Sequence, residues 1–335
     1  MSSADAVAVV LWIGVTLYAV FGGADFGAGM WTLLSGTGER GDRVRALIDW
    51  AIGPVWEANH VWLIFVFVVL WTAFGVAFEA IFSTLFIPFT LAALGIVLRG
   101  SGFAFHEFAA RARARRLAQR VFAISSVLTP FFMGTVVGAI ASGRVPPGNA
   151  QGDPVSSWAN PLSLLIGLLF VAAGAFLAAV FLTRDARRLG DADLERYFTR
   201  RAFAASIVAG AAAVAGIFAL RADARYVYDG LTSDGLPLVL LSAACGIAVL
   251  VMMWRGIPRW PRPLAIGAVA AIVWGWGVAQ HPYLLPQTLT IDAGAAPDAT
   301  LTWVLVVFGV AVVTVLPALG LLYVLTQRGA LETEP

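Results

Sequence analysis

Residues 159–183 read ANPLSLLIGLLFVAAGAFLAAVFLT, a run of 25 residues without a charged side chain. A helix needs about 20 mostly apolar residues to cross the hydrocarbon core of a bilayer, so this run predicts a transmembrane helix. Eight further segments pass the same test, and the nine spans are 6–34, 52–72, 77–98, 121–141, 159–183, 202–220, 236–254, 264–280 and 302–325. We therefore expect an all-α polytopic membrane helical bundle, with residues 1–335 as a single transmembrane domain.

Composition supports a membrane protein as well. Of the 335 residues, 60% are hydrophobic and 13% are charged, which is about half the charged share of a soluble domain. This composition excludes a soluble globular enzyme, a disordered chain and a nucleic-acid-binding module. The chain has no lysine and one cysteine, Cys245, so it lacks the lysine of a P-loop or Schiff base, an internal disulfide and a cysteine metal cluster.

The arginines predict the orientation of the spans. Of the 22 arginines, 19 fall in the loops after spans 1, 3, 5 and 7 and in the C-terminal tail. Only Arg144, Arg221 and Arg225 fall on the other side. Because basic residues gather on the cytoplasmic side of membrane proteins, we expect the N-terminus outside and the C-terminus in the cytoplasm. Pro88, Pro130 and Pro317 lie inside spans and are expected to kink them.

Few ionisable residues lie inside the spans, and each is a candidate functional group because a charge in hydrocarbon is costly. Asp25 lies in the segment 22–29, which reads GGADFGAG. Gly23 and Gly27 have the small-xxx-small spacing that lets a second helix approach closely. We expect Asp25 to face a helix, either as a hydrogen-bonded group that fixes helix packing or as part of a proton or ion pathway.

The segment 56–62, WEANHVW, holds the densest polar cluster of the spans. Glu57 and His60 are three residues apart and therefore share a helix face. A carboxylate and an imidazole on one face can pass a proton through intervening water. The alternative is a buried hydrogen-bonded pair without proton traffic. Trp56 and Asn59 are the supporting polar residues of this cluster.

The histidines do not favour a metal or haem site in this chain. His60 lies at a useful depth, whereas His281 is predicted on the opposite side of the membrane and His106 lies in an arginine-rich region. A site built from histidines alone lacks the number of ligands that a metal needs. A single axial haem ligand at His60 stays an alternative. We expect neither a catalytic side chain nor a metal ligand here.

Two motifs resemble subunit II of cytochrome bd-type quinol oxidases. Residues 23–30, GADFGAGM, resemble the family pattern G-F-D-x-G-x-G-M, and residues 53–64, GPVWEANHVWLI, resemble P-x-W-D-G-N-x-V-W-L-I. Residues 99–103, RGSGF, resemble an R-x-x-x-F pattern at the end of the third span. Further landmarks are Asn160-Pro161, Pro282, Pro286 and Pro317. The resemblance covers about residues 10–328.

The resemblance implies a fold of nine transmembrane helices with the orientation predicted above, in the bacterial cytoplasmic (inner) membrane. It implies a homologous partner, subunit I, which carries haem b, haem d and the quinol site. Such a complex oxidises quinol, reduces dioxygen to water and takes protons from the cytoplasm. Small accessory subunits, membrane lipids, and a structural lipid or quinone are further partners that the resemblance suggests.

The resemblance also implies roles for individual residues. Asp25 matches the Asp of the family's first span, Glu57 matches the Asp of its second span, and Trp56 and Asn59 match directly. His60 stands where the family more often has Gln or Glu. The implied proton pathway comprises Asp25, Glu57 and His60.

Two other functions compete with this one. A stand-alone secondary transporter or proton channel would use Asp25 and Glu57 as coupling carboxylates. However, the chain shows neither an internal repeat nor the polar interrupted spans of such transporters. The third hypothesis is a purely structural membrane scaffold.

Overall fold

The computed structural model describes residues 2–52, 56–108 and 112–327. Side chains of residues 56–58, 103, 105–108, 112, 113, 316, 319, 322, 323, 326 and 327 are outside the described part. In chain order the elements are α1 (Ser3–Leu17), η1 (Tyr18–Gly22), α2 (Gly23–Leu33), α3 (Glu39–Ile52), α4 (Trp56–Ala73), α5 (Gly75–Thr84), α6 (Phe86–Phe108), α7 (Ala112–Ala141), α8 (Pro161–Arg188), α9 (Ala192–Asp223), α10 (Arg225–Thr232), α11 (Leu236–Trp254), α12 (Pro261–Gln280), β1 (Tyr283–Leu285), β2 (Leu289–Thr290), α13 (Ile291–Gly294) and α14 (Asp298–Gln327).

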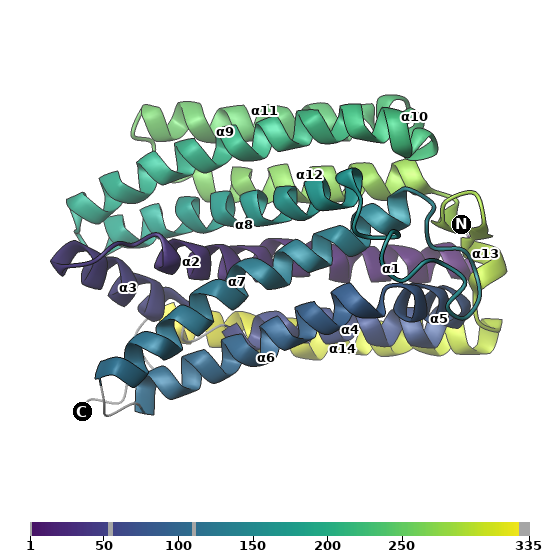
Figure 1. Ribbon diagram of the computed structural model, residues 1–335, viewed down its shortest axis with the longest axis horizontal. Helices are drawn as coiled ribbons and strands as arrows, with labels where there is room; N and C mark the ends of the chain where they lie inside the picture. Colours follow the sequence, from purple (N-terminus) through teal and green to yellow (C-terminus); the bar gives the residue numbers. More distant parts are fainter. Residues whose placement is uncertain (1, 53–55, 109–111, 328–335) are drawn as a thin grey trace.

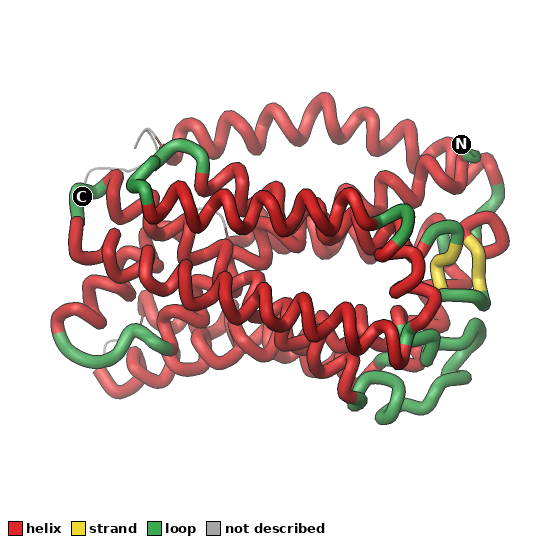
Figure 2. Tube along the Cα trace, turned by 90° about the horizontal axis from the view of Figure 1, so that it is seen from above, coloured by secondary structure: helices red, strands yellow, loops and turns green. Residues whose placement is uncertain are grey.

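The long helices run roughly along one axis, and the loops gather at the two ends of the bundle (Figures 1 and 2). The end that carries the N-terminus also carries α10, α13 and the antiparallel hairpin β1–β2. The opposite end carries α3, the turn between α8 and α9, and the end of α14 (Figure 1). We call this second end the arginine-rich end, because α3, the last turn of α8 and the α11–α12 turn all carry arginines.

Seven helices in the described residues are long and apolar enough to cross a membrane. They are Ser3–Leu33, Ala114–Ala141, Pro161–Arg188, Ala192–Asp223, Leu236–Trp254, Pro261–Gln280 and Asp298–Val315. α4 and α5 pass the test together, as a pair bent by 120°, and would raise the number to eight. The prediction of an all-α polytopic membrane bundle is confirmed, whereas the count of nine spans stays a prediction.

The predicted span 77–98 is not one helix. α5 ends at Thr84, and α6 begins two residues later. Pro88 therefore lies in the first turn of α6, where a proline is tolerated because the first helical N–H groups have no partner in the helix. The prediction that Pro88 kinks a helix interior was wrong. Pro130 and Pro317, by contrast, do lie inside helices.

The glycine spacing of the first span brings α2 against α8, as predicted. A Cβ atom on Gly27 would lie 2.0 Å from the carbonyl oxygen of Gly174, so only glycine permits this approach. The indole N–H of Trp31 then donates a hydrogen bond of 2.9 Å to the carbonyl oxygen of Ala175. The first span is thus fixed against the middle of α8, which positions the residues of α2 for the site described below.

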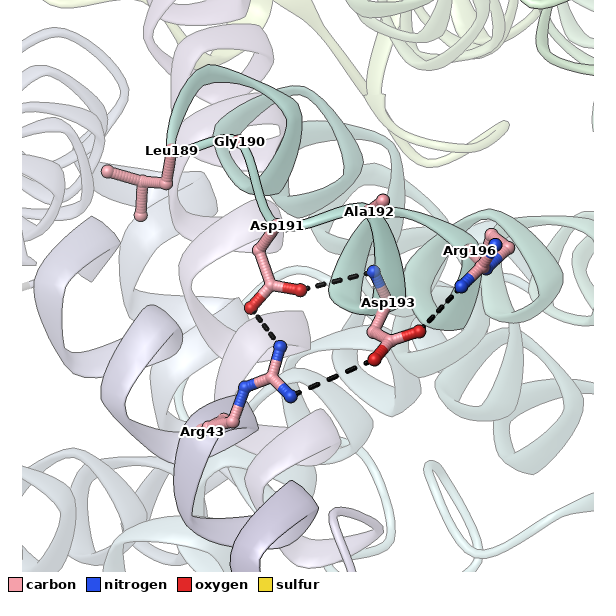
Figure 3. Close-up of a pocket in the computed structure, with 7 residues that line it drawn as sticks. All are labelled: Arg43, Leu189, Gly190, Asp191, Ala192, Asp193 and Arg196. Atoms are coloured by element: carbon pink, nitrogen blue, oxygen red, sulfur yellow. Dashed lines mark hydrogen bonds and ion pairs between the residues drawn. The ribbon is translucent and has the colours of Figure 1, made fainter.

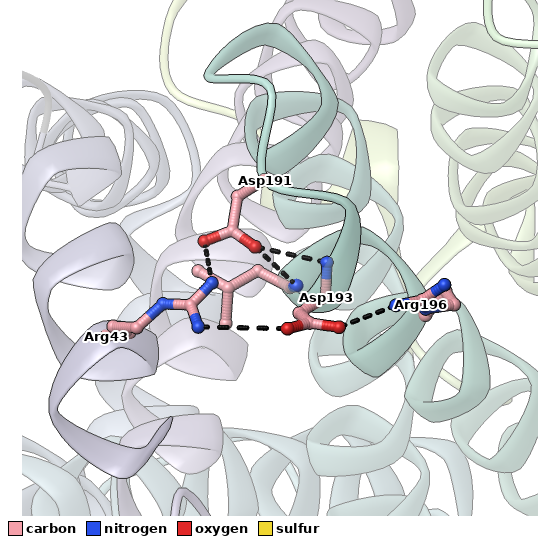
Figure 4. A network of polar contacts seen from close by, with 5 residues as sticks. Arg43, Asp191, Asp193 and Arg196 are labelled. Carbon is pink, nitrogen blue, oxygen red and sulfur yellow. Dashed lines mark hydrogen bonds and ion pairs between the residues drawn. The ribbon is translucent and has the colours of Figure 1, made fainter. Parts of the chain in front are cut away.

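A network of ion pairs ties α3 to the turn between α8 and α9 at the arginine-rich end (Figures 3 and 4). Arg43 pairs with Asp191 and lies 3.9 Å from Asp193, which in turn accepts from Arg196 at 2.6 Å. Asp191 also caps α9 by accepting from the N–H of Leu194 at 3.0 Å. The hydrogen bond from Arg43, followed by that from Leu194, holds the pKa of the Asp191 carboxyl below its usual range. The remaining residues that line this open pocket are Leu189, Gly190 and Ala192.

Candidate functional site

A buried ion pair joins the first span to α6. Asp25 lies in the first turn of α2, and its Oδ1 atom accepts a hydrogen bond of 2.7 Å from Nη2 of Arg99. The two side chains are 2% and 1% exposed, respectively. Their residues are 74 positions apart in the chain. Both charges are therefore removed from water, and each depends on the other for compensation.

Further contacts hold the Arg99 guanidinium in place. Its Nε donates a hydrogen bond of 3.0 Å to Oγ of Ser126, and its Nη2 reaches the backbone oxygen of Asp25 at 3.4 Å. The guanidinium also lies over the rings of Phe26 and Phe122, 5.0 and 4.7 Å from their centroids. Cation–π contacts of this kind are strongest where water is excluded. Arg99 is thus oriented from α2 and α7 at once.

The π-helical turn η1 brings Tyr18 to the same place. A π-helical turn holds more residues than an α-helical turn, and it shifts the side chains that follow it around the helix axis. The hydroxyl of Tyr18 interacts electrostatically with both Asp25 and Arg99. The Tyr18 ring also packs against Gly22, where a Cβ atom would lie 2.8 Å from the ring. Tyr18 therefore belongs to this site, although the sequence analysis did not select it.

Three polar atoms of this site make no hydrogen bond within the described residues. They are the Tyr18 hydroxyl, Oδ2 of Asp25 and Nη1 of Arg99, and all three are buried. Buried polar atoms are nearly always hydrogen-bonded, and ordered water is a common partner. Two donors and one carboxylate acceptor of this site therefore have hydrogen-bonding capacity that internal water could satisfy.

The second predicted cluster begins at the first turn of α4, next to the same site. The His60 ring packs edge-on against the Phe26 ring, with 5.9 Å between the centroids. Since Phe26 also lies under the guanidinium of Arg99, one aromatic ring contacts both clusters. Asn59 is buried. Glu57 and Trp56 lie in the first turn of α4, and their side chains are outside the described residues.

Counting Arg99 among the arginines of the cytoplasmic loop after span 3 was wrong. α6 continues for nine residues beyond Arg99, to Phe108, and the side chain is buried inside the bundle. A signal for this was present in the sequence. Residues 100–105, GSGFAF, carry no charge, so the span could have been extended beyond Arg99.

Among the described residues, no three His, Cys, Asp or Glu side chains gather as a metal site would require.

The chain is similar to proteins of one family over most of its length. The family model of cytochrome bd terminal oxidase subunit II matches residues 4–326. Cytochrome bd ubiquinol oxidase subunit 2 of Bacillus subtilis (strain 168) is 27% identical over 316 residues, which cover 92% of this chain and 89% of the relative. Cytochrome bd-I ubiquinol oxidase subunit 2 of Escherichia coli (strain K12) is 24% identical over 342 residues, which cover 89% and 88%.

A solved structure shares the fold. The bd oxidase from Geobacillus thermodenitrificans contains a chain that matches with a TM-score of 0.78. The match covers 100% of both chains at 24% sequence identity.

Proposed function

Because the chain belongs to the cytochrome bd terminal oxidase subunit II family, we propose that its buried polar site serves proton delivery in a quinol oxidase. The chain is a subunit of a cytochrome bd quinol oxidase complex and a multi-pass membrane protein of a bacterium. Reduction of dioxygen to water consumes protons, and a buried reaction site needs a polar route for them. This requirement connects the family's activity to the polar groups described above.

The haems and the quinol site are proposed to lie in subunit I, the homologous partner. The E. coli and B. subtilis relatives are named as subunit 2 of ubiquinol oxidases, which supports a complex of at least two chains. Of the two histidine side chains in the described residues, His60 packs inside the bundle and His281 is largely exposed beside Asp5. These two imidazoles therefore lie in different surroundings, which disfavours a pair of axial haem ligands in the described part of this chain.

The proposed proton pathway comprises Asp25, Glu57 and His60, with Trp56 and Asn59 as supporting residues. The observation that carries this proposal is the set of buried atoms without hydrogen-bond partners around the ion pair of Asp25. Oδ1 of Asp25 is held by Arg99, whereas its Oδ2 atom has no hydrogen-bond partner in the described residues. Its free Oδ2 atom then orders the water through which protons pass, towards His60 and the first turn of α4.

A substitution at His60 tests the pathway. His60→Phe keeps a ring against Phe26 but removes both nitrogen atoms, so we expect quinol oxidase turnover of the purified complex to fall several-fold. His60→Gln retains a side chain that hydrogen-bonds with water, and it should keep most of the turnover. The haem spectrum of each complex reports whether assembly is intact. Wild-type turnover in an assembled His60→Phe complex would remove His60 from the pathway.

We also propose nine membrane crossings in a single transmembrane domain formed by residues 1–335. The seven helices above and α4 account for eight crossings. The shorter apolar helix Phe86–Gly102 of α6 supplies the ninth, since α6 packs along α7. Nine crossings place the start of α1 and the end of α14 on opposite sides, which agrees with their positions at opposite ends of the bundle (Figure 1).

Single cysteines test this topology. In a Cys245→Ala background, Asn149→Cys lies in the loop after α7 and Ala192→Cys lies at the start of α9. A membrane-impermeant maleimide added to intact cells should label the cysteine at position 149. The cysteine at position 192 should react only after the membrane is opened. Labelling in the reverse order would show that the proposed orientation is inverted.

A further inference from the structure

A groove between α8, α9, α11 and α12 opens at the arginine-rich end of the bundle. Its polar lining includes Arg184, Arg187 and Arg262, and its apolar lining includes Val180 and Met253. We propose that this groove binds an anionic phospholipid, with the lipid phosphate on Arg184 and Arg262. Nothing in the proton-delivery proposal requires this site.

The charge of the groove is largely uncompensated. Arg187 is paired with Glu195 through a hydrogen bond of 2.8 Å from its Nε. Arg184 and Arg262 make no ion pair within 4.0 Å in the part of the chain that the structure describes. The carboxylate of Asp185 interacts electrostatically with both, and it also interacts with Arg188. Arg184 and Arg262 thus share one carboxylate, which leaves net positive charge for an anionic ligand.

The Arg262 guanidinium is held in position before any ligand binds. It lies over the ring of Phe181, 4.2 Å from the ring centroid. A guanidinium offers several N–H groups in a planar fork that fits the oxygen atoms of a phosphate. Arg184 is exposed on α8, so it can reach a headgroup from the other helix. The two cations come from α12 and α8, and one phosphate between them would link these helices.

The size and surroundings of the groove favour a lipid over a soluble anion. The enclosed part holds only about 30 Å³, about the share of liquid volume of one water molecule. A headgroup therefore lies across the mouth of the groove. Trp254 and Trp260 bracket the adjacent turn and are 78% and 58% exposed. Tryptophan in such positions is typical of the membrane–water interface, which is the depth of lipid phosphates.

The mouth of the groove also has an apolar side, formed by Met253 at the end of α11 and by Ile257, which is exposed. An acyl chain on this surface would stay in hydrocarbon while its phosphate meets the arginines. Basic pockets between transmembrane helices are known to bind anionic headgroups. A headgroup with net negative charge, such as that of phosphatidylglycerol, fits the net positive charge of Arg184 and Arg262 better than a zwitterionic headgroup does.

Native mass spectrometry of the detergent-purified complex tests the site. Delipidated wild-type complex is titrated with dioleoyl phosphatidylglycerol, dioleoyl phosphatidylcholine or inorganic phosphate. The variant Arg184→Gln/Arg262→Gln removes the two proposed ligands. The variant Arg115→Gln/Arg116→Gln removes the same charge from the exposed start of α7 and is the matched control. Arg184→Gln alone changes one exposed side chain. It shows whether lost lipid binding in the double variant comes from the removed arginines or from a folding defect.

We expect the dissociation constant of the most tightly bound phosphatidylglycerol molecule to rise about fivefold for each arginine removed, and about 30-fold when both are removed. The control should stay within about twofold of wild type, since its arginines are elsewhere. Phosphatidylcholine should bind weakly to all variants, and inorganic phosphate should not displace the lipid. The proposal would be overturned if the control variant lost as much phosphatidylglycerol affinity as Arg184→Gln/Arg262→Gln, or if phosphatidylcholine bound wild type as tightly. It would also be overturned if inorganic phosphate displaced the lipid, or if the dissociation constant of Arg184→Gln were unchanged.

Discussion

Replacing Arg99 by leucine should destabilise the assembled complex by about 3–5 kcal/mol, the typical effect of removing one partner of a buried ion pair. The carboxylate of Asp25 would remain in an environment where its side chain is 2% exposed. The hydrogen bond from Arg99 to Ser126 would also disappear. Thermal unfolding of the purified complex, followed by loss of the haem spectrum, measures the effect. A lowered yield of assembled complex is the expected outcome in cells.

A partly exposed ion pair provides the matched control. Arg144 and Asp223 form an ion pair joined by two hydrogen bonds, and each side chain is 34% exposed. Arg144→Gln should cost about 1 kcal/mol or less, because water compensates the remaining carboxylate. If Arg99→Leu proves as mild as this control, then the Asp25 carboxylate does not depend on Arg99 for charge compensation in the assembled complex.

A double variant separates the loss of charge balance from the loss of packing. Arg99→Leu/Asp25→Asn removes both charges, so no uncompensated ion stays buried. Replacing both members of a buried ion pair by uncharged residues often changes the free energy of unfolding little. We therefore expect the double variant to recover most of the stability that Arg99→Leu loses. Asp25→Asn alone should be as harmful as Arg99→Leu, since it leaves the guanidinium without its carboxylate.

The long apolar helices could be predicted from the sequence because their signal is local. Residues 159–183 contain every residue that decides whether they cross a membrane, and the structure places α8 there. The approach of a second helix to Gly23 and Gly27 was also predictable, because glycine spacing alone permits it. The identity of that helix was not, since Gly174 lies far away in the chain.

The ion pair at the centre of the site could not be predicted for the same reason. Asp25 and Arg99 are 74 residues apart, and only tertiary packing brings them together. The π-helical turn that aligns Tyr18 with this pair has no residue signature of its own. The ion pair between Asp25 and Arg99 ties α2 to α6, and Oδ2 of Asp25 makes no hydrogen bond within the described residues.

Glu57→Gln should lower quinol oxidase turnover by about an order of magnitude or more, the low end for loss of a proton-transfer group. Glutamine keeps a hydrogen-bonding shape close to that of glutamic acid but cannot carry a proton. Glu57 lies in the first turn of α4, three residues before His60, and the His60 ring contacts Phe26 beside the ion pair. Loss of the acid therefore interrupts the proposed route between α4 and Asp25.

The conservative variant distinguishes a proton carrier from a packing residue. Glu57→Asp keeps the acid and has the side chain that is usual in the family, so it should restore most of the turnover. The haem spectrum should be unchanged in both variants, because neither alters the partner subunit. An assembled Glu57→Gln complex with wild-type turnover would show that Glu57 packs and does not carry protons. Failure of Glu57→Gln to assemble, with normal assembly of Glu57→Asp, would instead assign the acid a structural role at the start of α4.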